Sequence, residues 1–493
     1  MALPMISKTS FLAGFQCPKL LWKRIIDREA FPPVDEGKQA IFDQGHAIGE
    51  LAKQLYPGGI EVGAGVVHRK TVVEEAAKLL ERRLPLYEPA FAFEDGYARI
   101  DILVPDRTEA WRIVEVKSGT KVKDENLLDV AFQLYVCRGA GLEITRCSII
   151  HVNNAYERQG EIDPAGLLIE EDVTEAVTGL LLDIAGRLAE LSSVVALPVC
   201  PEVPIGLHCS KPYSCELKAD CWSFLPKYPV TDLYNDKKGK RWEFLEAGTH
   251  GLADVPEPRR LNYKQQVQIK AAVSGEPHVA ELALARWFKT IRWPLAFFDI
   301  ETASSAIPFY DGTRPYQQVP FQFSLHVQHR PRGEVVHHEF LASGGEDPRP
   351  AFLEKLKDSL PKKGFIIVFN SSFERTCMLN CARHFPEHAW AEEILERMHD
   401  LLVPFRQFWY HHPDQHGSAS IKLVYPAVVG SSYSHLAIQD GQTAARAYAK
   451  AEFGGATPEE REHIRRDLLA YCELDTRAMV ELLDAIRVLA SRV

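Results

Sequence analysis

The most constraining feature of this sequence is a stretch of alternating apolar and polar residues that begins at Gly96. Residues 96–103 and 111–117 both alternate, and the turn-like residues 105–109 separate them. A period of two is typical of β-strands, so the pattern predicts a β-hairpin. Apolar side chains then recur at helical spacing over residues 127–134, which predicts a helix. A hairpin followed by a helix favours an α/β domain here.

Polar residues within this stretch can form a single site. Glu115 and Lys117 are two residues apart on the second predicted strand, so they point to the same side. Asp101 on the partner strand can face them, and Gln133 lies on the helix that follows. Two carboxylates and an ammonium suit a hydrolytic Mg²⁺ or Mn²⁺ site, because such ions prefer oxygen ligands and can activate water. The simpler alternative is the solvated face of a strand.

A second polar pair lies on a helix predicted over residues 41–56. His46 and Glu50 are four residues apart and share one face of that helix. Either side chain could therefore approach the same metal ion. The alternative is a polar pair on the protein surface.

Another group of acids occupies the C-terminal part of the chain. An apolar run over residues 294–302 contains Asp299 and Glu301, whose carboxylates share one strand face. A second predicted strand, residues 364–370, leads directly to Glu374, with Asp400 as the alternative acid. These segments can bring acids together at one end of a sheet.

A predicted helix over residues 464–488 completes this second group. It carries Tyr471 and Asp475 four residues apart, hence on one face. Four acids from three segments suit phosphodiester cleavage with two metal ions. The hydroxyl of Tyr471 can orient the attacking water.

The chain has ten cysteines, which are unevenly distributed along the sequence. Cys209, Cys215 and Cys221 follow one another at intervals of six in a segment rich in proline. Three thiols in such a segment can hold a metal centre, although the Cys-x-x-Cys pairs typical of zinc sites are absent. A fourth ligand must come from elsewhere. Buried structural thiols are the alternative.

Length and charge set limits on the class of protein. With 493 residues, two or three domains are expected. No apolar run approaches the ~18 residues that span a membrane, and the N-terminus lacks the apolar core of a signal peptide, so we expect a cytoplasmic protein. The net charge of −10 argues against a broad, sequence-blind nucleic-acid binder, although metal-binding acids contribute to it.

The first group resembles a known nuclease core. Asp101, the Glu115-Val116-Lys117 run and Gln133 resemble a PD-(D/E)XK nuclease of the RecB-like class, and Gly45, His46 and Glu50 resemble its first core helix. RecB-like nucleases associated with CRISPR systems close a [4Fe–4S] cluster with one cysteine before the core and three after it. The resemblance implies this ligand set, with Cys200 as a possible substitute for the first member: Cys17, Cys209, Cys215 and Cys221.

The second group resembles a DEDD exonuclease of the ribonuclease H-like superfamily, in its Tyr-x-x-x-Asp variant. The resemblance implies metal ligands at Asp299, Glu301, Glu374 and Asp475, with Tyr471 as a catalytic residue. The combination also resembles a bacterial family of uncharacterised proteins in which a RecB-like nuclease with cysteines is fused to an exonuclease-like domain. That match is carried by residues 299–302, 315–317 and 370–374.

These observations define the expected organisation. A PD-(D/E)XK restriction-endonuclease-like domain with an iron–sulfur cluster is expected over residues 1–226, and a helical connector over 227–290. A ribonuclease H-like exonuclease domain is expected over 291–493. Both the first and the last domain are expected to have a mixed central sheet flanked by helices.

The expected function is metal-dependent hydrolysis of nucleic acid, with DNA favoured over RNA and no membrane partner. Catalytic roles fall to Asp101, Glu115, Lys117, Gln133 and Tyr471. The expected cofactors are Mg²⁺ or Mn²⁺ and a [4Fe–4S] cluster, and His46 and Glu50 would join the first metal site. The alternative is a nucleic-acid-binding or redox-sensing partner protein with one or both sites inactive. Phage defence, CRISPR adaptation and repair are all compatible with these features.

Overall fold

The computed structural model describes residues 4–65, 68–107 and 109–491, which form two compact units. The first unit extends to Ser223 and also includes Ser305–Gln317. The second consists of Phe224–Ser304 and the chain from Gln318 onward. Residues 227–290 lie within the second unit. Each unit combines helices with a mixed sheet, as predicted for an α/β protein.

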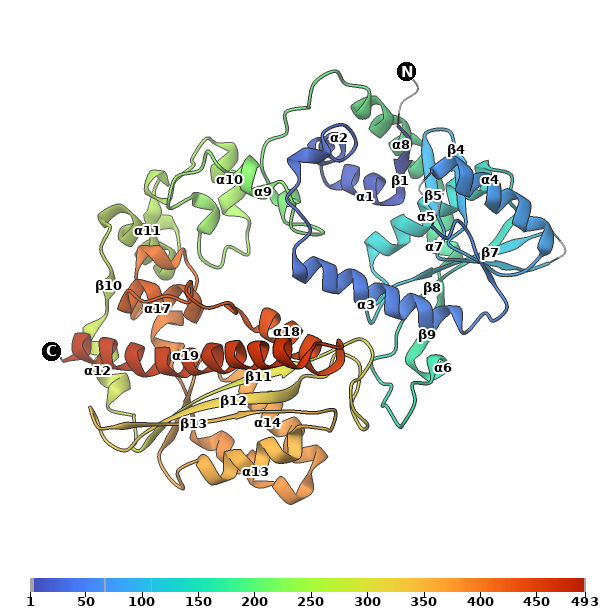
Figure 1. Cartoon of the computed structure of the whole chain (residues 1–493). Helices are drawn as coiled ribbons and strands as arrows, with labels where there is room; N and C mark the ends of the chain where they lie inside the picture. Colours follow the sequence, from blue (N-terminus) through green and yellow to red (C-terminus); the bar gives the residue numbers. More distant parts are fainter. Residues whose placement is uncertain (1–3, 66–67, 108, 492–493) are drawn as a thin grey trace. The chain divides into compact units, whose positions relative to one another are not determined.

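A mixed sheet with the strand order β2-β3-β6-β7-β8-β9 forms the centre of the first unit (Figure 1). Strands β6 (Ile102–Pro105) and β7 (Trp111–Val116) are antiparallel and form the predicted hairpin, and β8 (Ile144–Val152) runs parallel to β7. The remaining strands are β2 (Ile60–Glu61), β3 (Leu86–Tyr87) and β9 (Leu168–Asp172). A smaller sheet joins β1 (Ile6–Ser7), β5 (Gly96–Arg99) and β4 (Ala90–Phe93), so the strand expected over 96–103 is divided between two sheets.

Helices cover both faces of the larger sheet because its strands alternate in side-chain direction. Val114 of β7 packs in one apolar cluster with Ile48 of α3 (Glu36–Lys53), whereas Ile113 packs in another with Phe132 of α5 (Asp124–Gly139). Glu115 has the same parity as Ile113 and therefore faces α5. The other helices are α1 (Lys8–Gln16), α2 (Pro18–Ile26), α4 (Arg69–Leu79), α6 (Pro164–Leu167), α7 (Thr174–Gly179), α8 (Leu181–Val195) and α9 (Lys218–Cys221).

Residues 8–26 form two helices, α1 and α2, rather than one continuous helix. Cys17 lies between them with an extended backbone (φ −162°, ψ 124°), and Pro18 is the first residue of α2. Proline disfavours a helical conformation at the residue before it, which explains the interruption. The break places the Cys17 side chain at the junction of two helices rather than within one.

The central sheet of the second unit has the order β13-β12-β11-β14-β15. Its first three strands are antiparallel neighbours: β11 (Leu295–Ala303), β12 (Val319–Gln328) and β13 (Val335–Leu341). Strand β14 (Phe365–Val368) runs parallel to β11, and β15 (Met398–Asp400) runs parallel to β14. A short antiparallel pair joins β10 (His278–Val279) and β16 (Tyr410–His411).

Opposite faces of this sheet carry different side chains. Phe298 and Ile300 of β11 pack with residues of α13 (Arg349–Ser359) and α14 (Ser372–His384), whereas Asp299 faces the opposite side, where Cys472 of α19 (Pro458–Ala490) lies 3.9 Å away. Figure 1 shows α19 along one face of the sheet and α13 and α14 on the other. The other helices are α10 (Lys240–Glu246), α11 (Tyr263–Ser274), α12 (Glu281–Phe288), α15 (Trp390–Glu393), α16 (Val403–Arg406), α17 (Ile421–Val429) and α18 (Gly441–Phe453).

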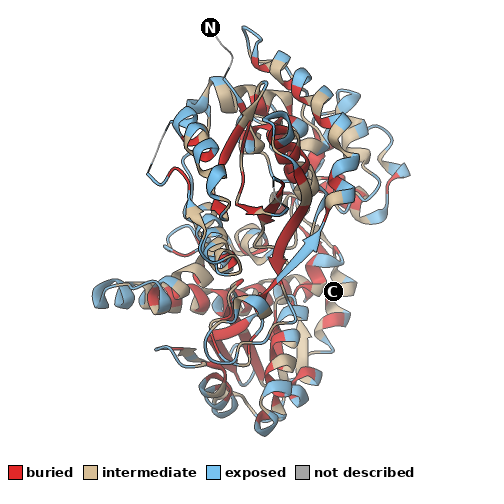
Figure 2. Ribbon diagram, turned by 90° about the vertical axis from the view of Figure 1, so that its right-hand side faces the viewer, coloured by how far each residue is buried: buried red, intermediate tan, exposed pale blue. Residues whose placement is uncertain are grey.

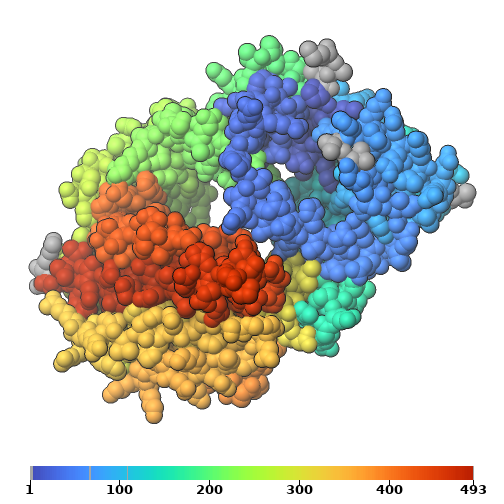
Figure 3. All heavy atoms as spheres, viewed as in Figure 1, coloured from blue at the N-terminus to red at the C-terminus, as the bar shows by residue number. Residues whose placement is uncertain are grey.

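Burial follows these layers in both units. Figure 2 shows buried residues gathered on the central strands, while the outward faces of helices and turns are exposed. In the space-filling view, α18 and α19 (red) form a continuous surface beside the strands of their sheet (Figure 3). Within the described residues, we find no helix with the length and apolar character needed to cross a membrane.

Candidate functional site

The sequence-predicted residues of the first unit lie in direct contact around Glu115. This carboxylate is 1% exposed and accepts hydrogen bonds from Lys117 Nζ at 2.6 Å and from Gln133 Nε2 at 2.7 Å. Asp101 precedes β6, and its Oδ2 accepts a hydrogen bond from the Val116 backbone N–H at 2.8 Å. The hairpin and α5 therefore bring together the four residues predicted from the alternating pattern.

Two further residues complete this group, which we call the N-terminal acidic cluster. Asp129, on α5 one turn before Gln133, accepts from Lys117 Nζ at 2.6 Å. Lys8 Nζ lies 2.9 Å from Glu115 Oε1 and 3.4 Å from Asp101 Oδ1, so an ammonium bridges the two carboxylates. The cluster consists of Lys8, Asp101, Glu115, Lys117, Asp129 and Gln133. The i, i+4 spacing to Gln133 is a signal that could have identified Asp129, whereas Lys8 is distant in sequence.

Electrostatics explain why both lysines stay charged despite their burial. Burial lowers the pKa of Lys8, but the charges of Asp101 and Glu115 outweigh it, and the pKa is raised well above its usual value. The pKa of Lys117 is raised in the same way, with Glu115 and Asp129 opposing burial. The cluster is therefore a largely compensated network of three carboxylates and two ammonium groups.

His46 and Glu50 do not join this cluster. Both are exposed on α3, and Glu50 pairs instead with Lys53 at 2.7 Å. Among the described residues, neither makes a hydrogen bond or ion pair with Asp101, Glu115 or Lys117. The face of α3 that packs on the sheet carries Ile48 and Ala52, which directs His46 and Glu50 away from it. The sequence correctly indicates their shared helix face but not where that face points.

The predicted C-terminal acids also meet in one place. Asp299, Glu301, Glu374, Tyr471 and Asp475 line a single cavity, the C-terminal acidic cavity. Its walls also include Ile300, Phe369, Phe373, Ile421, Lys422 and Met479. Three of the acids are at most 6% exposed, namely Glu301, Glu374 and Asp475. The period of two on β11 and the i, i+4 spacing on α19 thus converge as the sequence predicts.

Asp475 is held by two residues that the sequence did not identify. Lys422 Nζ on α17 lies 2.5 Å from Asp475 Oδ1, and the Tyr433 hydroxyl donates to the same oxygen at 2.7 Å. Lys422 also lies over the Tyr433 ring at 3.5 Å and the Tyr471 ring at 4.4 Å. No sequence spacing connects these residues, because they come from segments with no regular relation to α19.

The cavity has more negative charge than its single lysine can balance. Burial and the neighbouring Asp475 raise the pKa of Asp299 and that of Glu301 well above their usual values. Burial, with a contribution from Asp400, raises the pKa of Glu374 to about 8. In this arrangement the acids favour bound protons or another cation.

Glu374, rather than Asp400, faces the cavity. The carboxylate of Asp400 accepts from the backbone N–H groups of Asn370, Ser371 and Leu402 at 3.0, 3.3 and 2.9 Å, which fixes the turn before α14. Glu374 Oε2 is buried without a hydrogen-bond partner among the described residues. A buried carboxylate oxygen with no donor is a fitting ligand for a cation.

The four cysteines of the expected cluster line one cavity in the first unit. Cys17 lies at the α1–α2 junction, and the other three come from residues 209–221. Lys19, Lys218 and His208 are also in the wall, and they supply positive or polar groups near the thiols. Cys200, whose position the structure also describes, does not line this cavity. The geometry thus unites Cys17, Cys209, Cys215 and Cys221.

A family model described as "Domain of unknown function (DUF2779)" matches residues 296–420. This region contains Asp299, Glu301 and Glu374 but ends before Lys422, Tyr471 and Asp475. The matched segment is therefore the sheet of the second unit and part of its acidic cavity.

Three proteins, two from Mycoplasma and one from Ureaplasma, are similar to part of the chain. The uncharacterized protein MG366 of Mycoplasma genitalium is 26% identical over 215 residues, which are 38% of this chain and 31% of that protein. Its homolog in Mycoplasma pneumoniae is 27% identical over 234 residues, 40% of this chain and 33% of that protein. The uncharacterized protein UU173 of Ureaplasma parvum is 26% identical over 219 residues, 39% of this chain and 31% of that protein. The chain spans about a third of the length of the curated relatives it matches.

Proposed function

We propose that this protein is a metal-dependent nuclease with two phosphodiester-hydrolysing sites, and that DNA is its preferred substrate. The observation that carries the proposal is the convergence of Asp299, Glu301, Glu374 and Asp475 from three segments into one cavity beside Tyr471. Oxygen ligands gathered in this way suit two Mg²⁺ or Mn²⁺ ions rather than a structural role, because uncompensated buried acids are destabilising.

Sheet topology supports a ribonuclease H-like fold for the second unit. Three antiparallel strands are followed by two parallel ones, in the order β13-β12-β11-β14-β15. The central strand of this sheet is β11, which carries Asp299 and Glu301, the first two metal ligands that the resemblance implies.

The first unit has features that support a PD-(D/E)XK core. An antiparallel hairpin, β6–β7, is followed by α5 and by β8, which is parallel to β7. The resemblance implies an acid and a lysine two residues apart at the end of the second hairpin strand; Glu115 lies on β7 and Lys117 directly follows it. On α5, Gln133 donates a hydrogen bond to Glu115 and Asp129 accepts one from Lys117.

Both sites fit divalent cations. In the C-terminal acidic cavity, ligand atoms of Asp299 and Glu301 lie within 4.8 Å of each other, and Glu374 has an unpaired buried oxygen. In the N-terminal acidic cluster, Asp101 and Glu115 already share a cation, the ammonium of Lys8. Bound Mg²⁺ or Mn²⁺ would supply Lewis-acid activation of water and neutralise charge on the phosphate.

The residues of the chain would orient the ligands and the substrate. Gln133 and Lys117 fix the Glu115 carboxylate, and the Lys117 ammonium can offset negative charge on a phosphate oxygen. In the other site, Lys422 and Tyr433 hold Asp475 Oδ1. Burial and Asp475 raise the pKa of Tyr471, so its hydroxyl keeps its proton and can donate a hydrogen bond to a water or phosphate oxygen.

Digestion of end-labelled substrates tests the proposal. Purified protein should shorten single- or double-stranded DNA with Mg²⁺ or Mn²⁺, while EDTA should stop the reaction, and parallel RNA substrates measure the preference. A Lys117→Ala/Asp299→Ala double variant purified in the same way controls for contaminating nucleases. Equal cleavage by wild type and double variant, or no cleavage of any substrate, would contradict the proposed activity.

We further propose that the four thiols of the first unit hold a [4Fe–4S] cluster. Two observations support this proposal: the resemblance implies these four ligands, and the four cysteines line one cavity. A cluster held by them would join α1 and α2 to residues 209–221.

Iron and sulfide analysis of Cys17→Ser tests the cluster, with Cys200→Ser as the matched control. Cys17→Ser should lose visible absorbance and lower the melting temperature, because metal binding is coupled to folding; Cys215→Ser should behave alike. Cys200→Ser should keep both properties, since Cys200 does not line the cavity. Zinc in place of iron and sulfide would overturn the cluster assignment.

A further inference from the structure

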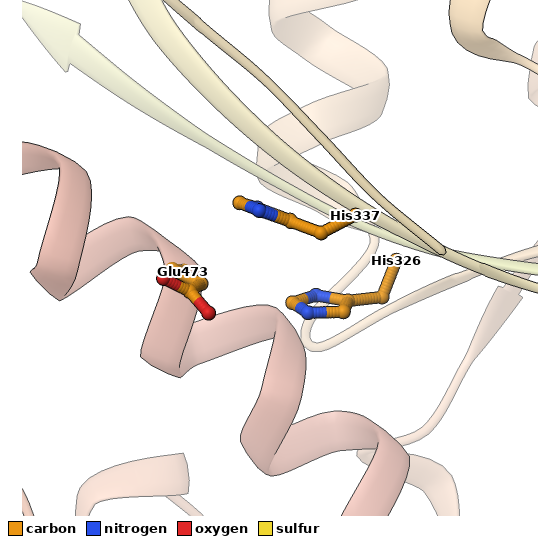
Figure 4. A group of neighbouring side chains, drawn as sticks. All are labelled: His326, His337 and Glu473. Carbon is orange, nitrogen blue, oxygen red and sulfur yellow. The ribbon is translucent and has the colours of Figure 1, made fainter. Parts of the chain in front are cut away.

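We propose that His326, His337 and Glu473 form a binding site for a transition-metal dication of the zinc type. Each offers one ligand atom, and these atoms lie within 4.8 Å of one another. The three side chains come from β12, β13 and α19, and Figure 4 shows them facing one another. His326 and His337 are direct cross-strand partners with ring centroids 4.5 Å apart.

A buried hydroxyl network supports His326. The Thr476 hydroxyl lies 3.1 Å from the Glu473 carbonyl oxygen, 2.6 Å from the Ser324 hydroxyl and 2.8 Å from His326 Nδ1. Its one proton can serve only one of these partners. Donation to the Glu473 carbonyl oxygen makes Thr476 Oγ1 an acceptor for the Nδ1 proton of His326 and leaves a free lone pair on Nε2.

The same arrangement orients His337. Its Nε2 lies 2.9 Å from Ser324 Oγ. When the Ser324 proton is donated to Thr476, Nε2 of His337 is the donor and Nδ1 has a free lone pair. Histidines that bind metals commonly donate their second N–H to a partner in this way, which orients the ring and fixes the tautomer. Ser324 and Thr476, at most 1% exposed, occupy this supporting position.

The third ligand adds charge without closing the site. Arg477 Nη2 pairs with Glu473 Oε1 at 3.0 Å, which leaves the second carboxylate oxygen available. Two imidazole nitrogens and one carboxylate oxygen suit zinc and its neighbours in the first transition row. Mg²⁺ prefers oxygen ligands alone, so this site and the C-terminal acidic cavity should select different ions.

A metal ion at this position would connect α19 to the sheet. Glu473 lies between Tyr471 and Asp475 on α19, whereas the two histidines belong to β12 and β13. An ion held by all three would fix the turn of α19 that carries the cavity residues. The binding proposal itself does not depend on nuclease activity, because it follows from the ligand geometry alone.

Zinc binding can be measured by isothermal titration with zinc chloride in excess Mg²⁺, together with elemental analysis after dialysis. Wild-type protein should bind one more equivalent of zinc than His337→Ala or Glu473→Gln. The substituted ligands should weaken this event by about 100-fold or more, and Thr476→Val by about 10- to 100-fold, because it removes the acceptor that fixes His326. Zinc should also raise the melting temperature of wild type more than that of His337→Ala.

His338→Ala is the matched control. It removes an imidazole from the neighbouring position of β13, where His338 pairs with Leu325 and points to the opposite face of the sheet. It should bind zinc as wild type does. Unchanged zinc binding in Glu473→Gln, which alters a partly exposed side chain, would overturn the site even if His337→Ala failed to fold. Equal losses in His338→Ala and His337→Ala would overturn it as well.

Discussion

The two acidic sites differ in how their negative charge is balanced. In the N-terminal acidic cluster, three carboxylates share two lysines, and Lys8 and Lys117 contact Glu115 directly. In the C-terminal acidic cavity, four acids share the single ammonium of Lys422. The pKa values follow this difference: lysine pKa values are raised in the first site, whereas burial raises the pKa values of Asp299, Glu301 and Glu374 in the second.

This difference indicates distinct relations to metal ions. In the first site an incoming dication must compete with an ammonium that is already bound between Asp101 and Glu115. In the second site a dication relieves repulsion among acids that otherwise retain protons. We therefore expect the C-terminal acidic cavity to depend more strongly on metal for stability, and the N-terminal acidic cluster to depend more on its lysines.

The largest expected effect is the separation of the two proposed cleavage activities by single substitutions. Asp299→Ala should lower cleavage at the C-terminal acidic cavity by about 100-fold or more, because it removes a ligand of the proposed metal ion. Lys117→Ala should abolish the products of the N-terminal acidic cluster. Neither substitution should affect the products of the other site. Product ladders on one panel of labelled substrates provide the measurement.

Asp311→Ala is a suitable control for both variants, because Asp311 is an exposed acid that lines neither site. If Asp299→Ala alters no product on any substrate, the second unit is better regarded as a module that binds nucleic acid or a partner.

The next largest expected effect is a change in how the free energy of unfolding depends on pH in the absence of divalent ions. The pKa of Glu374 is about 8 in the folded protein and near 4.5 when unfolded. Between these values the unfolded state releases a proton that the folded state keeps, so stability falls as pH rises from about 4.5 to about 8. Glu374→Gln cannot ionise and should be more stable than wild type at pH 8 by a few kcal/mol, on the order of the pKa difference. Denaturant unfolding at pH 4.5, 6.5 and 8 measures this.

Glu115→Gln provides the contrast from the first site. Its ionised form is paired with Lys8 and Lys117, so the substitution should destabilise the protein at neutral pH rather than stabilise it. Saturating Mn²⁺ should remove the advantage of Glu374→Gln. A gain in stability in both Glu374→Gln and Glu115→Gln, or in neither, would show that the two sites do not differ in charge balance.

Local periodicity explains which parts of this comparison the sequence could predict. Glu115 with Lys117, Asp299 with Glu301, and Tyr471 with Asp475 share faces because strands repeat every two residues and helices return after four. The same rule fails for His46 and Glu50, since a shared helix face does not say whether that face meets the site or solvent. Packing of Ile48 on the sheet decides this, and such packing depends on distant strands.

Such patterns could not predict contacts between residues that are distant in the sequence. Lys8 contacts Glu115 across 107 positions of sequence, and Lys422 contacts Asp475 across 53. Neither contact follows a helical or strand period. The interruption at Cys17 had a local signal in Pro18, whereas the position of its thiol beside residues 209–221 was expected from the family resemblance and not from any spacing in the sequence. The charge balance of each site is thus a property of tertiary structure.

A smaller effect is expected from removing the bridging ammonium. Lys8→Met should let Asp101 and Glu115 bind Mn²⁺ about tenfold more tightly, because the dication no longer displaces a competing cation. The concentration of Mn²⁺ at half-maximal activity for the products lost in Lys117→Ala measures this shift. Lys121→Met serves as the control, since Lys121 is an exposed lysine on the segment after β7. A higher requirement for Mn²⁺ in Lys8→Met would mean that Lys8 supports the ion instead of competing with it.

The smallest expected effect separates two tyrosines of the C-terminal acidic cavity. Tyr433 donates to Asp475 Oδ1 at 2.7 Å, so Tyr433→Phe should weaken binding of the ion that Asp475 holds. Tyr471→Phe retains the ring beneath Lys422 and removes only the hydroxyl, which we propose contacts the reactants, so it should lower turnover with little effect on metal affinity. Each change removes about one hydrogen bond, which corresponds to roughly a two- to tenfold effect. Turnover and half-maximal Mn²⁺ concentration, measured together, distinguish the two variants. If both tyrosines affect only metal affinity, Tyr471 positions Asp475 and does not contact the reactants.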